Sequence, residues 1–129
     1  MSESIAPAET TLGWGDDEFG RTAGFNRADL KQLVLGDISG VLIPKAGLKT
    51  SGKREIARIE KRWTGLKQDH LKRCAIRAKE RQSPGVIVAS LGRNKAEIVS
   101  ACISRGFINH LLIDQDLADE LPRWLDRNQ

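Results

Sequence analysis

Two short apolar stretches and two amphipathic stretches alternate in residues 84–125, and this alternation constrains the fold more than any other feature of the chain. Residues 86–89 read VIVA and are flanked by proline and glycine, which is typical of a strand buried on both faces. From Lys95 onward the apolar residues follow helical spacing, and Gly106 stands where a left-handed cap would end the helix. We therefore predict a strand over residues 86–89 and a helix over residues 95–105.

The same alternation follows a second time. Residues 111–113 are apolar and predict a second buried strand, and Asp114 comes directly after it, where it can cap the next helix. Leu117, Leu121 and Leu125 lie along one face of that helix. A strand, helix, strand and helix in this order form a βαβα unit, so the two strands should be parallel and the crossover right-handed.

The N-terminal part of the chain carries weaker signals. Residues 1–11 hold few large apolar side chains and are predicted to form a disordered tail. Asn26 is a suitable N-cap for a helix that Gly36 would end, and a third strand is predicted over residues 38–43. Residues 12–129 then form one domain of the α/β class, a partial Rossmann-like parallel sheet with flanking helices.

Basic residues are concentrated in residues 45–82, which hold thirteen Lys and Arg against four Asp and Glu. This segment carries a net charge of +9 and the rest of the chain carries −5, although the net charge of the whole chain is only +4. A basic block of this kind can bind nucleic acid or another polyanion. Its charges also alternate with apolar residues at helical spacing, over residues 53–63 and over residues 69–80 with Asp69 as the cap, and this pattern equally predicts the solvated faces of two amphipathic helices.

Several classes of protein are disfavoured by what the sequence contains. No apolar stretch approaches the roughly 20 residues of a transmembrane helix, and the acidic N-terminus does not resemble a secretory signal, so we expect a cytoplasmic protein without membrane contact. Cys74 and Cys102 are far apart on predicted apolar stripes and are expected to be buried thiols. No nucleophile elbow, phosphate-binding P-loop or metalloprotease motif occurs, and we expect neither catalysis nor a metal or cofactor.

The most suggestive polar segment is SLGRNK at residues 90–95, between the end of a predicted strand and the start of a helix. Parallel sheets place ligands at such turns, where backbone N–H groups and the helix dipole favour an anion. Arg93 or Lys95 could add a positive charge beside Gly92 and Asn94. Turns of this composition also occur for capping and solubility alone, so both interpretations remain open.

Two carboxylates stand next to predicted strands. Asp114 is first of all a helix N-cap, whereas Asp37 precedes a strand and has no helix to cap. The candidate ligand-binding residues are Asp37, Gly92, Arg93, Asn94, Lys95 and Asp114.

These residues belong to a longer pattern that resembles a known family. The segment GDISG at residues 36–40, the turn with Lys95, and RGFINHLLIDQDLADEL at residues 105–121 resemble the sugar-binding domain of SorC-type transcriptional regulators. The corresponding run of that family reads like glvNvLvTDeatA. The residues that match it are Gly106, Asn109, Leu111, Asp114 and Ala118.

The resemblance implies a fold like half of a sugar-phosphate isomerase domain and the binding of a phosphorylated sugar. It implies that Asp37 accepts hydrogen bonds from sugar hydroxyls and that Lys95 meets a phosphate or hydroxyl. The chain resembles only the C-terminal half of such a domain, without the DNA-binding helix-turn-helix and without the glycine- and threonine-rich phosphate loop. Where the family usually has two glycines, this chain has Leu91 and Gly92.

Three functional hypotheses follow. The first is a non-catalytic module that binds a phosphorylated sugar in transcription regulation, with no direct contact to DNA. The second is an interaction protein that pairs with a longer homologue or with itself, because missing sheet neighbours would leave apolar surface exposed. The third is a nucleic-acid-binding protein that uses residues 45–82.

Overall fold

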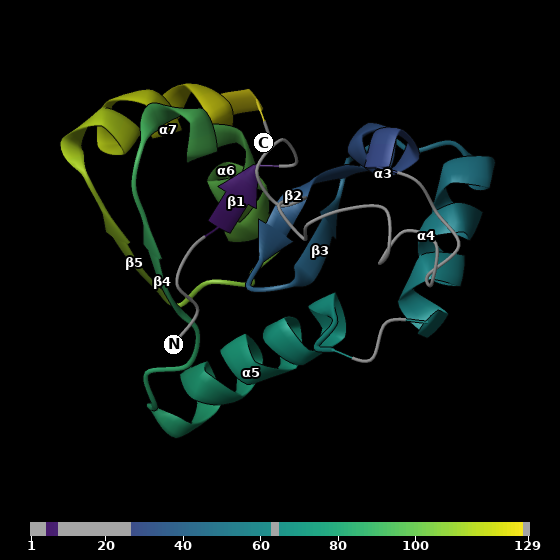
Figure 1. Ribbon diagram of the computed structural model, residues 1–129. Coiled ribbons are helices and arrows are strands. Elements are labelled where there is room, and N and C mark those ends of the chain that lie inside the picture. The colour runs from purple at the N-terminus through teal and green to yellow at the C-terminus, as the bar shows by residue number, and fades with distance from the viewer. Residues whose placement is uncertain (1–4, 8–26, 63–64, 128–129) are drawn as a thin grey trace.

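The computed structural model describes residues 5–7, 27–62 and 65–127 of the chain. Helices and strands are mixed, and the strands form two small sheets (Figure 1). Residues from both sheets pack in one hydrophobic cluster. In Figure 1 the C-terminal elements gather at one end, and α3 (Arg27–Leu33) and α4 (Thr50–Arg62) lie at the other. Helix α5 (Gln68–Arg81) lies along the bottom of this view, from below the C-terminal group toward α4. The predictions for residues 1–4 and 8–26, including the N-cap at Asn26, lie outside the described residues.

The predicted βαβα unit is present. Strand β4 (Ile87–Ser90) pairs in parallel with β5 (His110–Ile113). They are joined by the short 3-10 helix η1 (Arg93–Lys95) and by α6 (Ala96–Ser104), and α7 (Gln115–Arg127) follows. The prediction of two adjacent parallel strands connected through a helix is therefore confirmed.

Helix α6 ends as its sequence predicts. Gly106 has a φ of +73°, a left-handed conformation that glycine adopts without the steric cost of a side chain. The N–H groups of Gly106 and Phe107 donate to the carbonyls of Ile103 and Cys102, each over 3.0 Å, and this pair of bonds is a Schellman cap. The cap turns the chain toward β5 and buries Phe107 in the core.

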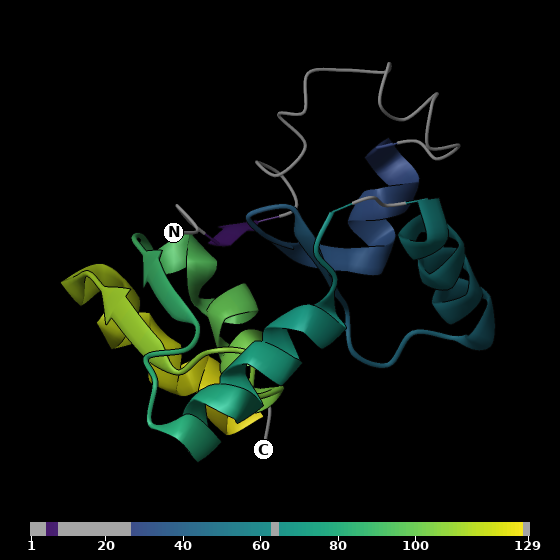
Figure 2. The ribbon, with the colours of Figure 1, turned by 90° about the horizontal axis from the view of Figure 1, so that it is seen from below.

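One core cluster joins the two sheets. The inner face of the parallel pair packs with α6, α7 and residues of the antiparallel sheet. The fully buried side chains of this cluster include Ile43, Val88, Val99, Cys102 and Leu117. Figure 2 shows the same relation from below, with α6 between the parallel strands and the antiparallel sheet. The shared core fixes the carboxyl ends of β4 and β5 relative to the rest of the fold.

The prediction of one strand over residues 38–43 is wrong. Residues 38–43 do not make one strand in the parallel sheet; β2 (Val34–Ile38) and β3 (Val41–Pro44) pair as an antiparallel hairpin. Strand β1 (Ile5–Pro7) pairs antiparallel with β2 on the other side. The reason lies in Ser39 and Gly40, whose φ angles of 44° and 84° reverse the chain in a two-residue turn.

The helix before this hairpin is shorter than predicted. Helix α3 (Arg27–Leu33) ends at Leu33, and Gly36 lies inside β2 and not at a helix end. Leu30 and Val34 are both fully buried, as the apolar stripe predicts, although Val34 already belongs to the strand. The sequence therefore predicts the buried residues correctly but places the end of the helix too late in the chain.

The basic segment folds into two amphipathic helices, α4 (Thr50–Arg62) and α5 (Gln68–Arg81). Their buried residues are Ile56 and Ile59 in α4 and Ala75 and Ala78 in α5. All Lys and Arg side chains of these two helices are exposed, as the solvated-face interpretation predicts. None of the described helices is long and apolar enough to cross a membrane.

Two details of α5 differ from prediction. Asp69 was expected to cap the helix, but the helix begins at Gln68, and the N–H of Lys67 donates to Nδ1 of His70 over 3.1 Å. Cys74 was expected to be buried and is exposed, because the packed face of α5 runs through Ala75 and Ala78. Cys102 is buried as predicted.

Candidate functional site

The turn between β4 and α6 lies at the carboxyl end of the parallel pair, as the sequence predicts. Gly92 precedes η1, and the N–H of Lys95 donates back to the Gly92 carbonyl over 3.2 Å. Asp114 follows β5 at the same edge, because the carboxyl ends of parallel strands lie side by side. The structure therefore brings together five of the six predicted ligand-binding residues.

The Asp114 carboxylate connects the two turns. Its oxygens accept the N–H of Gly92 over 3.1 and 3.2 Å, and Oδ1 also accepts the N–H of Leu117 over 3.1 Å. These bonds from Gly92 and Leu117 lower the pKa of Asp114, with a smaller contribution from the positive charge of Lys95. Asp114 is thus the N-cap of α7 and at the same time holds the β4–α6 turn in place.

This arrangement changes the interpretation of the turn. The N–H of Gly92 is one of the groups that a bound anion would use at a helix start, and the Asp114 carboxylate already accepts it. Arg93 lies 3.9 Å from the Glu120 carboxylate, so its charge faces α7. Asn94 is exposed, and Lys95 is half-buried beside Asp114.

Asp37 lies in the other sheet. It is only 6% exposed in β2, and its Oδ2 accepts the N–H of Gly40 in the hairpin turn. Strand β1 pairs with β2 and lies against η1. One strand therefore separates Asp37 from Lys95, and the Asp37 carboxylate stabilises a tight turn.

Ser90, the last residue of β4, was not among the predicted site residues. Its side chain is 1% exposed, and its hydroxyl has no hydrogen-bond partner within the described part of the chain. A buried hydroxyl without a partner is rare, because it loses its bonds to water. A serine that ends an otherwise apolar strand is the sequence signal that could have drawn attention to it.

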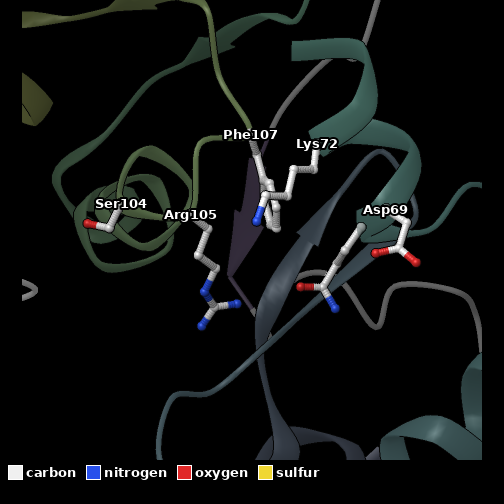
Figure 3. A pocket seen from close by; sticks show the side chains of 6 residues that line it. Asp69, Lys72, Ser104, Arg105 and Phe107 are labelled. Atoms are coloured by element: carbon white, nitrogen blue, oxygen red, sulfur yellow. The ribbon is translucent and has the colours of Figure 1, made fainter. Parts of the chain in front are cut away.

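A separate pocket of about 400 Å³ opens between the start of α5 and the end of α6 (Figure 3). The residues that line it are Gln68, Asp69, Lys72, Ser104, Arg105 and Phe107. None of them was predicted as a site residue. They come from two segments more than thirty residues apart, and no local pattern in the sequence joins them.

The outer face of the parallel pair is a third notable surface, which we define as Ile87, Ala89, His110 and Leu112. Cross-strand pairs place these residues on the side opposite Val88, with Ile87 beside His110 and Ala89 beside Leu112. Ile87 is 40% exposed and Leu112 is 63% exposed. Leu91, directly after β4, is 64% exposed.

Among the described residues, no three His, Cys, Asp or Glu side chains come together as a metal site would require. Comparison of the sequence with known protein families and with curated proteins finds no match. The SorC-type resemblance therefore stays a prediction from the residues quoted above.

Proposed function

We propose that this chain is a non-catalytic interaction module whose parallel pair becomes part of a wider, Rossmann-like sheet when a second polypeptide covers it. The partner is a longer homologue of the SorC type, which supplies the first half of an effector domain. Such a complex acts in the cytoplasm in the regulation of transcription. The observation that carries the proposal is the exposure of Ile87 and Leu112 on the outer face of β4 and β5.

Parallel sheets are normally covered on both faces, because their crossovers place helices there. In this chain α6 and α7 cover the inner face, and no described helix or strand covers the outer one. Burying an apolar side chain that is about half exposed contributes on the order of 1 kcal/mol. Burial of three such side chains, Ile87, Leu91 and Leu112, would therefore offset part of the free-energy cost of association.

The edge of β5 supports the same proposal. Within the described ranges β5 pairs with β4 and with no other strand, so it has one row of backbone groups available for pairing. Exposed edges are usually protected by charged residues or proline, and β5 reads HLLI. A strand of the partner can therefore extend the sheet at β5 while its other residues cover Leu112.

The experiment compares binding of the purified chain to the purified effector domain of a longer SorC-type regulator by fluorescence anisotropy. We expect Leu112→Glu to weaken binding at least tenfold, because it places a charge in the buried interface. Ile76→Glu is the matched control, since Ile76 is 46% exposed on α5 and belongs to neither β4 nor β5. Equal effects of the two variants, or no association of the wild type, would contradict the proposal.

A second candidate is the binding of a phosphorylated sugar at the β4–α6 turn, and the unpartnered hydroxyl of Ser90 favours it. A ligand at this edge could contact Lys95, and the Ser90 hydroxyl at the end of β4 could then bond to the same ligand. Because Asp114 already accepts the Gly92 N–H, we expect binding by the isolated chain to be millimolar at best. Asp37 is buried in β2 and its carboxylate holds the hairpin turn, so we expect no contact between Asp37 and this ligand.

Calorimetry with phosphorylated and unphosphorylated sugars tests this candidate on the wild type, Lys95→Ala and Asp37→Ala. We expect Lys95→Ala to weaken binding roughly tenfold, as the loss of one charge-assisted hydrogen bond does. An unchanged affinity of Lys95→Ala, or no binding of any sugar, would remove this candidate. The interaction proposal would stand in either case.

A further inference from the structure

The pocket between α5 and α6 holds two positive charges from different parts of the chain. Lys72 comes from the second turn of α5, and Arg105 follows the last residue of α6. In Figure 3 the two side chains enter the pocket from opposite sides, while the hydroxyl of Ser104 points away. Neither cation forms an ion pair with a carboxylate in the described part of the chain.

Arg105 is held in a fixed orientation. One of its terminal nitrogens donates to the Pro44 carbonyl at the end of β3 over 2.6 Å. The remaining N–H groups of the guanidinium stay available on a side chain that has already lost much of its freedom, and a planar fork of this kind suits phosphate or carboxylate oxygens. Preorganisation of this kind lowers the entropic cost of binding.

The helix ends around the pocket also favour a negative ligand. The first N–H groups of α5, at Gln68 and Asp69, have no acceptor within the helix because of their position in its first turn. The last carbonyls of α6 are different, since Ile103 and Cys102 accept the N–H groups of the Schellman cap. The pocket therefore lies beside N–H donors at the start of α5 and beside the end of α6, where the Schellman cap already occupies the last carbonyls.

We propose that this pocket binds a small organic anion that carries a phosphate or carboxylate group. Lys72 and Arg105 contact the anionic group together with the first N–H groups of α5, and Phe107 provides an apolar floor. The volume of about 400 Å³ lies in the range of small-molecule sites and favours a compact ligand over an extended nucleic acid. Asp69 adds one carboxylate to the lining, which disfavours ligands with many negative charges.

The experiment is a titration of the ¹⁵N-labelled full chain with inorganic phosphate, phenyl phosphate and benzoate, followed by NMR at fixed ionic strength. We expect saturable shifts at the amides of residues 68–72 and 104–107 and at Nε–H of Arg105. Phenyl phosphate should bind more tightly than inorganic phosphate because its ring can reach Phe107. A phosphate preference over benzoate would identify the anionic group.

Lys72→Ala should weaken phenyl phosphate binding about tenfold, because one charge-assisted bond is lost. Lys79→Ala is the control, since it removes the same charge from an exposed position of the same helix outside the pocket. It should change the affinity by less than about twofold, because exposed charges at a distance are screened. Arg105→Lys keeps the charge, loses the fork and should also bind more weakly.

Three outcomes would overturn the proposal. Equal losses in Lys72→Ala and Lys79→Ala would indicate general attraction to a basic surface. Absence of localised, saturable shifts would indicate that the pocket is unoccupied by these anions. In a parallel titration with duplex DNA, shifts along α4 and α5 that are larger than those caused by phenyl phosphate in the pocket would indicate a nucleic-acid interface.

Discussion

The N–H of Gly92 donates to the Asp114 carboxylate over 3.1 and 3.2 Å, so the turn after β4 is tied to the turn after β5. The same carboxylate caps α7 through Leu117, and the two strand ends and the helix start therefore depend on one charged group. A ligand at this edge has to bind around that bond or replace it.

This relationship predicts a dependence of stability on pH. Hydrogen bonds from Gly92 and Leu117 hold the pKa of Asp114 below its ordinary value of 3.8 in the folded chain. Because the folded pKa is lowered, the ionised carboxylate stabilises the fold above pH 3.8, and this contribution is lost as the pH falls through the lower folded pKa. Urea unfolding of the wild type and Asp114→Asn between pH 2.5 and 6 measures it.

We expect the stability difference between wild type and Asp114→Asn to be largest near pH 6 and to shrink toward pH 2.5. Asp126→Asn is the control, since Asp126 is exposed near the end of α7. A difference that is the same at both ends of the pH range would show that the charge of Asp114 is not what stabilises the turn.

A second prediction concerns Asn109, whose side chain joins α5 to the start of the parallel pair. Its Oδ1 accepts the N–H of Val86 over 2.8 Å, and its Nδ2 donates to the Ala75 carbonyl over 3.1 Å. Asn109→Ala leaves both backbone groups without these partners and should lower the free energy of unfolding by about 1–3 kcal/mol. Denaturant unfolding measures the change. Asn94→Ala, at an exposed asparagine, should cost less than about 0.5 kcal/mol.

A third prediction concerns Ser90. Its buried hydroxyl has no partner among the described residues, so Ser90→Ala removes an unsatisfied polar group and leaves the packing nearly unchanged. We expect the ligand-free variant to be as stable as the wild type or more stable by up to about 1 kcal/mol. Ser100→Ala is the comparison, because the Ser100 hydroxyl donates to the Glu97 carbonyl over 2.8 Å and its loss should not stabilise the chain. Thermal unfolding that ranks Ser90→Ala below Ser100→Ala would contradict this prediction.

The sequence was sufficient to predict the parallel unit because each step there is local. The change from an apolar stretch to helical spacing marks β4 and α6, Gly106 marks the cap, and Asp114 marks the next helix. The hairpin is not predicted, because Ser39-Gly40, a turn signal, stands inside an apolar stretch whose composition favours one strand. A left-handed conformation at Ser39 is uncommon for a residue with a side chain.

The candidate sites could be predicted only where they lie at the carboxyl edge of the parallel pair. Residues 92–95 and Asp114 were brought together by the general rule that parallel strands end at one edge. Asp37 could not be placed, because its position depends on the hairpin and on the pairing of β1 with β2. The pocket with Lys72 and Arg105 depends on how α5 crosses the end of α6, and this packing leaves no periodic signal in the sequence.

The last prediction separates the two cysteines by reactivity. Burial raises the pKa of the Cys102 thiol to about 12, whereas Cys74 is exposed. The thiolate is the reactive form, so at pH 8 Cys102 should stay protonated and unreactive in the folded chain. With Ellman's reagent we expect one fast thiol per native chain and two per chain in denaturant. In Cys74→Ser the fast phase should disappear. The raised pKa also means that the protonated thiol of Cys102 stabilises the fold below the ordinary value of 9.0, and that this contribution is lost as the pH rises toward 12. A fast native reaction in Cys74→Ser would show that Cys102 is accessible and that the shared core opens more readily than its packing implies.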